Sequence, residues 1–354
     1  MAGLTVGETY ILYGLWTEGS SWNYDYVYFT VKPAITTYAT DGTETFTKPS
    51  GTSYTAPANA LVVDVSGTGI TSITPNTQPN AIYIYSGTKP TGLDGKNVVQ
   101  QLGESYEAES ISLTDGYDFF TPVNIGSGSI EFSYNFTVGA DGTNGWNTLM
   151  LPFEAECVTA DGTDIAWFHS STDTGKNFWL KKFVNDDATH VYFDYEEDFA
   201  VKPNTPYIVA FPGDHWGAAW DLSAKEIIFT GTGTIHKSDA FSSVTGANYR
   251  FIGSTMQNNT TNIYCLNASG NKFELKETGG SGPFRAFFKP GAFDSSITSL
   301  GIGSGDATSI SLPTINDQRS TINSGWYTLN GMRLDGKPTT QSVYIHNGKK
   351  IVIK

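Results

Sequence analysis

The sequence has few charged residues, and basic residues are the scarcer kind. Charged residues make up 16% of the 354 positions, against roughly 25% in an average soluble protein. There are 21 Lys and Arg against 35 Asp and Glu, which gives a formal net charge of −14. This balance repels phosphate backbones and anionic lipid surfaces, so nucleic-acid binding is not expected. Neutral glycans, calcium or simple solubility are compatible with it.

Long apolar runs and cysteine clusters are also lacking. No run of about 18 apolar residues exists, so no membrane span is expected. Cys157 and Cys265 form no metal-type cluster, and they are either two buried thiols or one disulfide. The first ten residues show neither the basic nor the apolar region of a signal peptide. We therefore expect that a signal was removed or that this is the C-terminal part of a longer product.

Catalytic motifs are lacking as well. The sequence has no Gly-x-Ser-x-Gly elbow, no His-Glu-x-x-His helix and no phosphate-binding Gly-Lys-Thr loop. Its five histidines are scattered singly, without a second ligand at metal spacing. The densest acidic cluster, Glu196-Glu-Asp198, is expected to be a solvated turn, because neighbouring strand residues face opposite sides and a glycosidase needs two facing carboxylates. We expect no catalytic residue, no cofactor and no metal site.

Glycine and aromatic residues are abundant. The chain contains 38 Gly, 19 Tyr, 21 Phe and 8 Trp. Tyr, Phe, Trp and Thr favour strands, and Gly and Asn favour the tight turns between them. The composition therefore predicts an all-β protein.

Turn-rich segments divide the chain into five parts. Residues 4–31 predict a β-hairpin, with strands at 9–13 and 24–31. Short, turn-punctuated strands after residue 126 predict an antiparallel β-sandwich-like domain. The predicted parts are a hairpin remnant of an upstream module (1–33), a short-strand β-rich region with solenoid-like coils as one interpretation (34–125), the sandwich-like domain (126–300), a Gly/Ser-rich linker (301–317) and a small C-terminal β unit (318–354).

The C-terminal unit carries a recognisable pattern. It contains Trp326-Tyr-Thr-Leu-Asn-Gly-Met-Arg333 and Val343-Tyr-Ile-His-Asn-Gly-Lys-Lys-Ile-Val-Ile-Lys354. This stretch resembles the C-terminal domains of exported Bacteroidota proteins of the Bacteroides and Prevotella type, although Ser342 replaces a more usual Gly. The resemblance implies a cell-surface or extracellular, outer-membrane-associated location, with export machinery as a partner of the tail.

Two upstream segments are similar to a module found beside leucine-rich repeats in the same surface proteins. They begin with Leu113-Thr-Asp-Gly-Tyr-Asp-Phe-Phe-Thr-Pro122 and Gly145-Trp-Asn-Thr-Leu-Met-Leu-Pro-Phe153. The similarity extends over most of residues 80–300. Members are described as adhesion or cell-surface proteins, so it implies a location better than a ligand.

One loop, Phe211-Pro-Gly-Asp-His-Trp-Gly-Ala-Ala-Trp-Asp221, is the best candidate for a glycan site. It places Trp216 and Trp220 among glycines, where indoles can stack on sugar rings, and Asp214 can accept sugar hydroxyls. Trp167 and Trp179 are candidates for the same region. The alternative is that these indoles close the end of the sandwich core.

The sequence leaves three alternative functions. The first is a non-catalytic, surface-displayed interaction module for adhesion or scaffolding, with glycans or host and surface proteins as partners. The second is a carbohydrate-binding module of a polysaccharide-utilisation protein, which the aromatic content favours. The third is a glycoside hydrolase, for which facing carboxylates across a cleft would be required.

Overall fold

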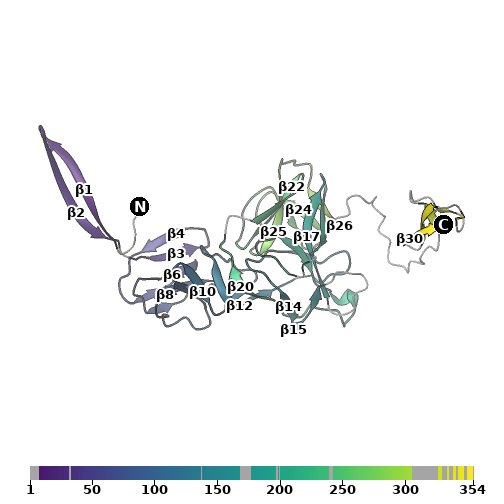
Figure 1. Ribbon diagram of the computed structural model, residues 1–354, viewed down its shortest axis with the longest axis horizontal. Coiled ribbons are helices and arrows are strands. Elements are labelled where there is room, and N and C mark those ends of the chain that lie inside the picture. Colours follow the sequence, from purple (N-terminus) through teal and green to yellow (C-terminus); the bar gives the residue numbers. More distant parts are fainter. Residues whose placement is uncertain are drawn as a thin grey trace. The chain divides into compact units, whose positions relative to one another are not determined.

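The regular elements of the described chain are β-strands. The structure is a computed structural model that describes residues 8–31, 33–136, 138–167, 177–196, 198, 200–238, 242–304, 326–328, 333–334, 338–339, 342–346 and 349–353. Within these residues there are strands and one 3-10 turn, η1 (Asp214–Trp216), but no α-helix. The all-β prediction is confirmed. The chain divides into two compact units, Met1–Gly305 and Asp306–Lys354, whose strands are drawn in Figure 1.

The chain begins with a two-stranded ribbon, β1 (Thr9–Glu18) and β2 (Ser21–Thr30). The register runs from Thr9 opposite Thr30 to Glu18 opposite Ser21, and Gly19 provides the positive φ of the turn. Its large side chains are exposed on both faces, up to 61% for Leu12 and 75% for Trp22. An isolated hairpin is only marginally stable in water, so cross-strand contacts such as Tyr13 with Tyr26 (5.9 Å between ring centres) contribute much of its order.

A first large sheet follows the ribbon. Its strand order is β15-β14-β20-β12-β10-β9-β8-β6-β3-β4, and β11 also pairs with β12. The strands are β3 (Ile35–Ala39), β4 (Glu44–Thr47), β6 (Ala60–Asp64), β8 (Ile82–Ser86), β9 (Asn97–Leu102), β10 (Ser105–Ala108), β11 (Ile111–Thr114), β12 (Ile125–Tyr134), β14 (Cys157–Ala160), β15 (Thr163–Asp164) and β20 (Ile227–Ile235).

Short parallel coils form the part of this sheet that contains β6, β8 and β9. These three strands pair in parallel, and on the opposite side β5 (Ser53–Thr55) pairs in parallel with β7 (Ser72–Thr74). The backbone N–H of Thr71 donates to the Thr52 carbonyl and that of Thr91 to the Thr71 carbonyl, so one coil stacks on the next. The interior is an apolar cluster that includes Val63 and Ile73.

Buried amides close the turns of these coils. The Asn80 side chain donates to the carbonyls of Thr114 and Tyr117 and accepts the Thr114 N–H. Asn97 makes the same kind of two-way contact with the backbone of Ser112. A buried amide is stable only when its donors and acceptors are satisfied, so these asparagines tie the coils to the strands that follow them.

A second large sheet contains most of the later strands. Its order is β13-β19-β17-β18-β26-β24-β23-β25-β22-β21, and β16 pairs with β17. The strands are β13 (Trp146–Leu149), β16 (Ala166–Trp167), β17 (Asn177–Asp186), β18 (His190–Tyr195), β19 (Tyr207–Ala210), β21 (Ser242–Thr245), β22 (Tyr249–Ser254), β23 (Ile263–Leu266), β24 (Lys272–Lys276), β25 (Arg285–Pro290) and β26 (Ser299–Ser304).

The second sheet curls until its two ends approach one another. The backbone N–H of Met150, just after β13, donates to the Phe284 carbonyl (3.1 Å). The N–H of Ala286 on β25 donates to the Thr148 hydroxyl (3.0 Å). Because β13 is one edge of the sheet and β25 lies near the other, the sheet encloses an interior of its own.

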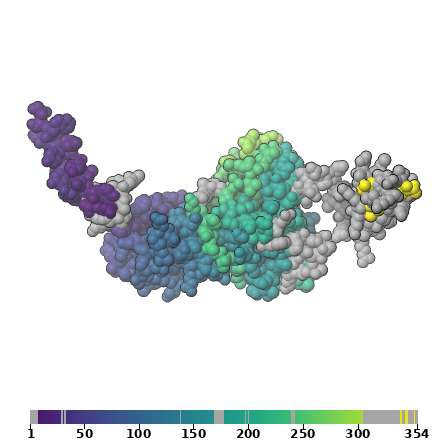
Figure 2. Space-filling model, in the orientation of Figure 1, coloured from purple at the N-terminus to yellow at the C-terminus, as the bar shows by residue number. Residues whose placement is uncertain are grey.

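Besides the cluster inside the coils, the first unit has two further large hydrophobic clusters. One lies between the two large sheets and includes Val62, Phe132, Phe229 and Phe284. The other lies inside the curled sheet and includes Phe288, whose ring centre is 4.5 Å from that of Phe251. In Figure 2 the blue early strands pack directly against the teal and green later ones, as the first cluster requires.

The structure places no boundary at residue 125, where one was predicted. β12 lies in the first sheet and pairs in parallel with β11 along Ile111–Thr114. The first cluster also takes residues from both sides of this point, and residues 126–300 contribute to more than one cluster. Turn residues such as Pro122 and Asn124 predict a reversal of the chain, but they do not show whether the next strand joins the same sheet.

The C-terminal end of the predicted sandwich-like domain also differs between prediction and structure. Residues 301–304, assigned to the linker, belong to β26, which pairs in parallel with β18 and antiparallel with β24. The rest of the predicted linker lies outside the described residues. In the second unit, β27 (Trp326–Thr328), β28 (Arg333–Leu334), β29 (Ser342–His346) and β30 (Lys349–Ile353) form one sheet in the order β28-β27-β29-β30. The Asn-Gly pairs at 330–331 and 347–348, whose composition predicts hairpin turns, also lie outside the described residues.

Both cysteines are free thiols, and of the two only Cys265 is buried, whereas Cys157 is half-buried. Cys157 lies on β14 in the first sheet and Cys265 on β23 in the second. Burial raises the pKa of the Cys265 thiol to about 11, so this thiol stays protonated at neutral pH. No helix in the described part of the chain is long and apolar enough to cross a membrane.

Candidate functional site

Three neighbouring strands of the curled sheet place two indoles in one row. Trp146 on β13 lies opposite Ala210 on β19, and Trp179 on β17 lies opposite Ala210 from the other side. Cross-strand partners share a face of the sheet, and the spacing of strands sets the two tryptophan backbones roughly 10 Å apart. Only the Ala210 methyl stands between them. The row therefore has an indole on each side and the small Ala210 side chain between them.

A third indole comes from the loop after β19. The η1 turn presents Trp216, which is 41% exposed, and its ring centre lies 5.3 Å from that of Trp179 at an interplanar angle of 47°. The backbone N–H of Trp216 donates to the Gly213 carbonyl, and the backbone N–H of Gly217 donates to the Asp214 carbonyl. Gly217 has a φ of +86°, which glycine adopts at little cost. The loop thus holds one ring at the mouth of the row.

A second loop closes the floor beneath Trp216. The Ala140 N–H donates to the Phe211 carbonyl (2.7 Å), and the Gly213 N–H donates to the Ala140 carbonyl (3.1 Å). A Cβ on Gly139 would stand 2.6 Å from the Gly213 Cα, closer than real side chains approach. Glycine at position 139 is therefore required for the two loops to pack together, which fixes Trp216 relative to the sheet.

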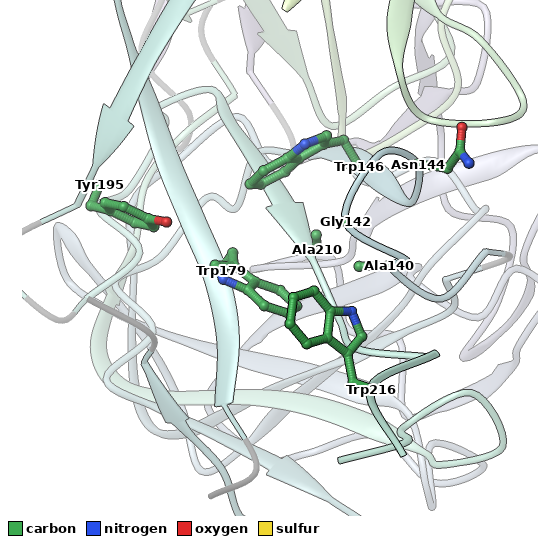
Figure 3. A pocket seen from close by; sticks show the side chains of 8 residues that line it. All are labelled: Ala140, Gly142, Asn144, Trp146, Trp179, Tyr195, Ala210 and Trp216. Carbon is green, nitrogen blue, oxygen red and sulfur yellow. The ribbon is translucent and has the colours of Figure 1, made fainter. Parts of the chain in front are cut away.

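These elements enclose a cavity of about 200 Å³, the aromatic pocket. Figure 3 shows the Trp179 and Trp216 rings side by side, Trp146 across from them and Tyr195 at one side. Trp179 is buried, and Trp146 and Tyr195 pack against the small cluster that it forms with Ala140 and Ala210. None of the described residues that line the aromatic pocket is Asp or Glu. They are Ala140, Gly142, Asn144, Trp146, Trp179, Tyr195, Ala210 and Trp216.

Asn144 is the amide at the rim of the aromatic pocket, and it is held in place. Its Nδ2 donates to the Asp141 carboxylate (2.7 Å), and its Oδ1 accepts from the Asn271 amide (2.9 Å). The Asn144 amide, with the backbone N–H groups of Asn144 and Thr143, holds the pKa of the Asp141 carboxyl well below its usual range. Asp141 is therefore ionised, and its carboxylate orients the Asn144 amide.

A cation stands between two walls of the aromatic pocket. Lys181 follows Trp179 by two positions on β17, so both side chains share a face. Its Nζ lies 4.6 Å from the centre of the Tyr195 ring and 5.4 Å from that of Trp146. Burial lowers the pKa of Lys181, and the charge of Asp194 opposes this shift. Burial also raises the pKa of Tyr195, so its hydroxyl is neutral at neutral pH.

The structure brings together two of the five residues predicted for a glycan site. Trp216 and Trp179 both line the aromatic pocket. Trp220 does not line it. Its side chain is half-buried, and its backbone N–H donates to the Gly217 carbonyl. Asp214 is exposed at the start of η1, outside the set of lining residues.

Trp167 lies on the other side of the sheet. Its ring centre is 4.5 Å from that of Phe178, and it packs against the cluster between the two large sheets. Phe178 and Trp179 are adjacent on β17 and therefore face opposite ways. Trp167 is therefore a core residue, as the alternative prediction for these indoles has it, and it does not line the aromatic pocket.

Sequence reasoning missed Trp146, Tyr195, Lys181 and Asn144. The alternation of Trp179 and Lys181 along one strand was a usable signal for Lys181. The others depend on strand order: Trp146 reaches Trp179 only through the pairing of β13 and β17 with the same residue of β19. Sequence pattern alone does not specify such a register.

The buried acidic side chains Glu196 and Asp186 have structural partners. Glu196 is buried and accepts hydrogen bonds from the Tyr207 hydroxyl (3.1 Å) and Lys182 (3.4 Å). Asp186 is buried as well and accepts from the backbone and side chain of Asn248. Among the described residues, no group of three or more His, Cys, Asp or Glu could hold a metal ion.

No protein-family model, curated protein sequence or solved structure matches this chain.

Proposed function

We propose that this chain is a non-catalytic interaction module that binds carbohydrate in the aromatic pocket. The observation that carries the proposal is the row of Trp146, Ala210 and Trp179, with Trp216 held over it. Flat indole faces favour the C–H faces of a sugar ring, and indole N–H, tyrosine hydroxyl and amide groups can bond its hydroxyls. The small Ala210 leaves room for such a ring between the walls.

The size of the aromatic pocket favours one sugar unit. Sites for drug-sized ligands enclose roughly 300–1,000 Å³, whereas this cavity encloses about 200 Å³. The rings are tilted around a pocket and do not form a flat platform, since Trp179 and Trp216 meet at 47°. Such a site suits the end unit of a glycan better than a stretch in the middle of a chain.

A glycan array with purified protein tests this function, with substitutions in one loop as the matched pair. Trp216→Ala removes an exposed lining ring and should abolish glycan binding while changing the melting temperature little. Trp220→Ala, four residues later in the same loop but outside the pocket lining, should leave binding intact. Equal binding by wild type and Trp216→Ala would refute the aromatic pocket as the site.

The proposed location is the cell surface, and it rests on the tail. Its support is the resemblance of residues 326–354 to export and anchoring tails of Bacteroidota surface proteins. In the native host, deletion of residues 318–354 should keep the protein inside the cell envelope. Protease treatment of intact cells measures this, and unchanged surface display would count against a sorting role.

A second candidate function, scaffolding by self-association, is favoured by the β1–β2 ribbon. The two strands pair only with each other among the described strands, and free strand edges can pair with another chain. The matching edge of a second copy would offer the same length and the same exposed aromatic side chains. Sedimentation of the full chain and of a chain lacking residues 8–31 tests this. A monomer at high concentration in both cases would exclude it.

A further inference from the structure

The ammonium of Lys181, beside the aromatic pocket, has no hydrogen-bond acceptor among the residues that the structure describes. Lys181 carries three N–H donors, and within the described residues its Nζ makes no hydrogen bond and no ion pair. Its contacts are the faces of Tyr195 and Trp146, and the charge of Asp194 acts on it from the neighbouring strand. Ring faces attract an ammonium group without accepting its hydrogen bonds in the usual sense.

The next lysine along β17 shows the contrast. Lys182 faces the other side of the sheet, and its Nζ lies 3.4 Å from Glu196, whose side chain is only 5% exposed. The strand thus supplies a close carboxylate to the lysine away from the aromatic pocket and none to the lysine beside it. A partly buried ammonium with free donors is costly unless a partner is provided. Lys181 reaches the aromatic pocket through the two lining rings that its ammonium contacts, Trp146 and Tyr195.

We propose that the aromatic pocket selects a sugar ring that carries a carboxylate, such as a terminal uronic acid. The ring lies between the indole walls, and the carboxylate accepts hydrogen bonds from the Lys181 ammonium. This inference rests on the proposed carbohydrate-binding function. The negative net charge of the chain disfavours acidic ligands in general, so selection of one must come from this local cation.

The expected selectivity follows from the type of bond. A hydrogen bond between charged groups contributes more than one between neutral groups, by an amount that corresponds to about tenfold in affinity or more. The wild-type protein should therefore bind a uronic acid at least about tenfold more tightly than the matching neutral sugar. The two sugars of such a pair differ only at C6, where a carboxylate replaces a hydroxymethyl group.

Titration calorimetry with three matched pairs tests the proposal: the methyl glycosides of glucose, galactose and mannose, each with its uronic acid. Lys181→Met keeps an apolar stem of similar length and should abolish the preference while leaving neutral-sugar affinity within about twofold. Lys181→Arg should retain the preference. Lys225→Met, which removes the same charge at an exposed ion pair with Asp161, is the control and should behave as wild type.

The outcomes separate the two levels of the proposal. Equal affinity of the wild type for both members of every pair would overturn the acidic-sugar inference and leave carbohydrate binding in place. A preference that survives in Lys181→Met would overturn the role of this lysine. Absence of binding to all six sugars by folded wild type would overturn both. The comparison of sugars needs only the wild-type protein, so it decides the question even if a variant fails to fold.

Discussion

Two regions of this chain are rich in tryptophan and tyrosine, and they use these residues in opposite ways. In the aromatic pocket, Trp179 is buried to 9% exposure and the other rings are fixed by sheet register and tight loops. In the β1–β2 ribbon, the rings stand on two strands with exposed faces. The same side chains therefore act as a shaped cavity in one place and as an open surface in the other. What differs is the number of neighbouring strands that support them.

The largest expected effect concerns the packed unit itself. Phe288 is fully buried inside the curled sheet, with the rings of Phe251, Phe273 and Phe183 around it. Phe288→Ala should lower the free energy of unfolding by about 3–5 kcal/mol, because it leaves a cavity that neighbours cannot fill. Urea unfolding measures this. A loss below about 1 kcal/mol would mean that the enclosed core is not packed as described.

Two of the three pocket indoles, Trp179 and Trp216, should differ in their effect on stability and agree in their effect on binding. Trp179→Ala should cost about 2–3 kcal/mol of unfolding free energy, since the ring is buried at the edge of a cluster. Trp216→Ala should cost about 1 kcal/mol or less, because the ring is partly exposed. Both should abolish glycan binding. If both substitutions lowered the unfolding free energy by a similar, large amount, Trp216 would be a core residue like Trp179.

Alkaline pH should weaken the packed unit through its buried tyrosines. Burial, mainly, raises the pKa of Tyr249 from 10.0 to about 12, and its hydroxyl donates to the Ala188 carbonyl (2.7 Å). The unfolded chain loses this proton first, so the contribution is fully present below pH 10 and is lost as pH rises toward 12. Tyr249→Phe should show a shallower fall in stability between pH 10 and 12. An unchanged slope in denaturant titrations would contradict the assignment.

The smallest effect is expected in the ribbon. Trp22 is 75% exposed, so Trp22→Ala should change the unfolding free energy of the packed unit by less than about 0.5 kcal/mol. It should also leave glycan binding as in wild type. A loss comparable to that of Trp179→Ala would show that the ribbon is packed against the unit in solution, and the contrast between the two regions would disappear.

Local chemistry was enough to predict the strands and part of the site. Glycine-rich turns and β-branched or aromatic runs gave the all-β class, and the glycines around Trp216 pointed to its loop. The position of Trp146 and Tyr195 depends on which strands pair and in which register, and this is decided by packing between residues distant in sequence. The parallel pairing of β12 with β11 across the boundary predicted at residue 125 depends on strand pairing in the same way.

The most direct test of the central claim is the response of the tryptophan indole N–H signals to ligand. The chain contains 8 Trp, and nuclear magnetic resonance resolves one indole signal for each. Titration with a glycan chosen from the array should shift the signals of Trp146, Trp179 and Trp216 together, at one affinity. The signals of Trp16 and Trp22 in the ribbon should not move. Shifts confined to the ribbon, or a bound glycan that leaves the three pocket signals in place, would contradict the aromatic pocket as the binding site.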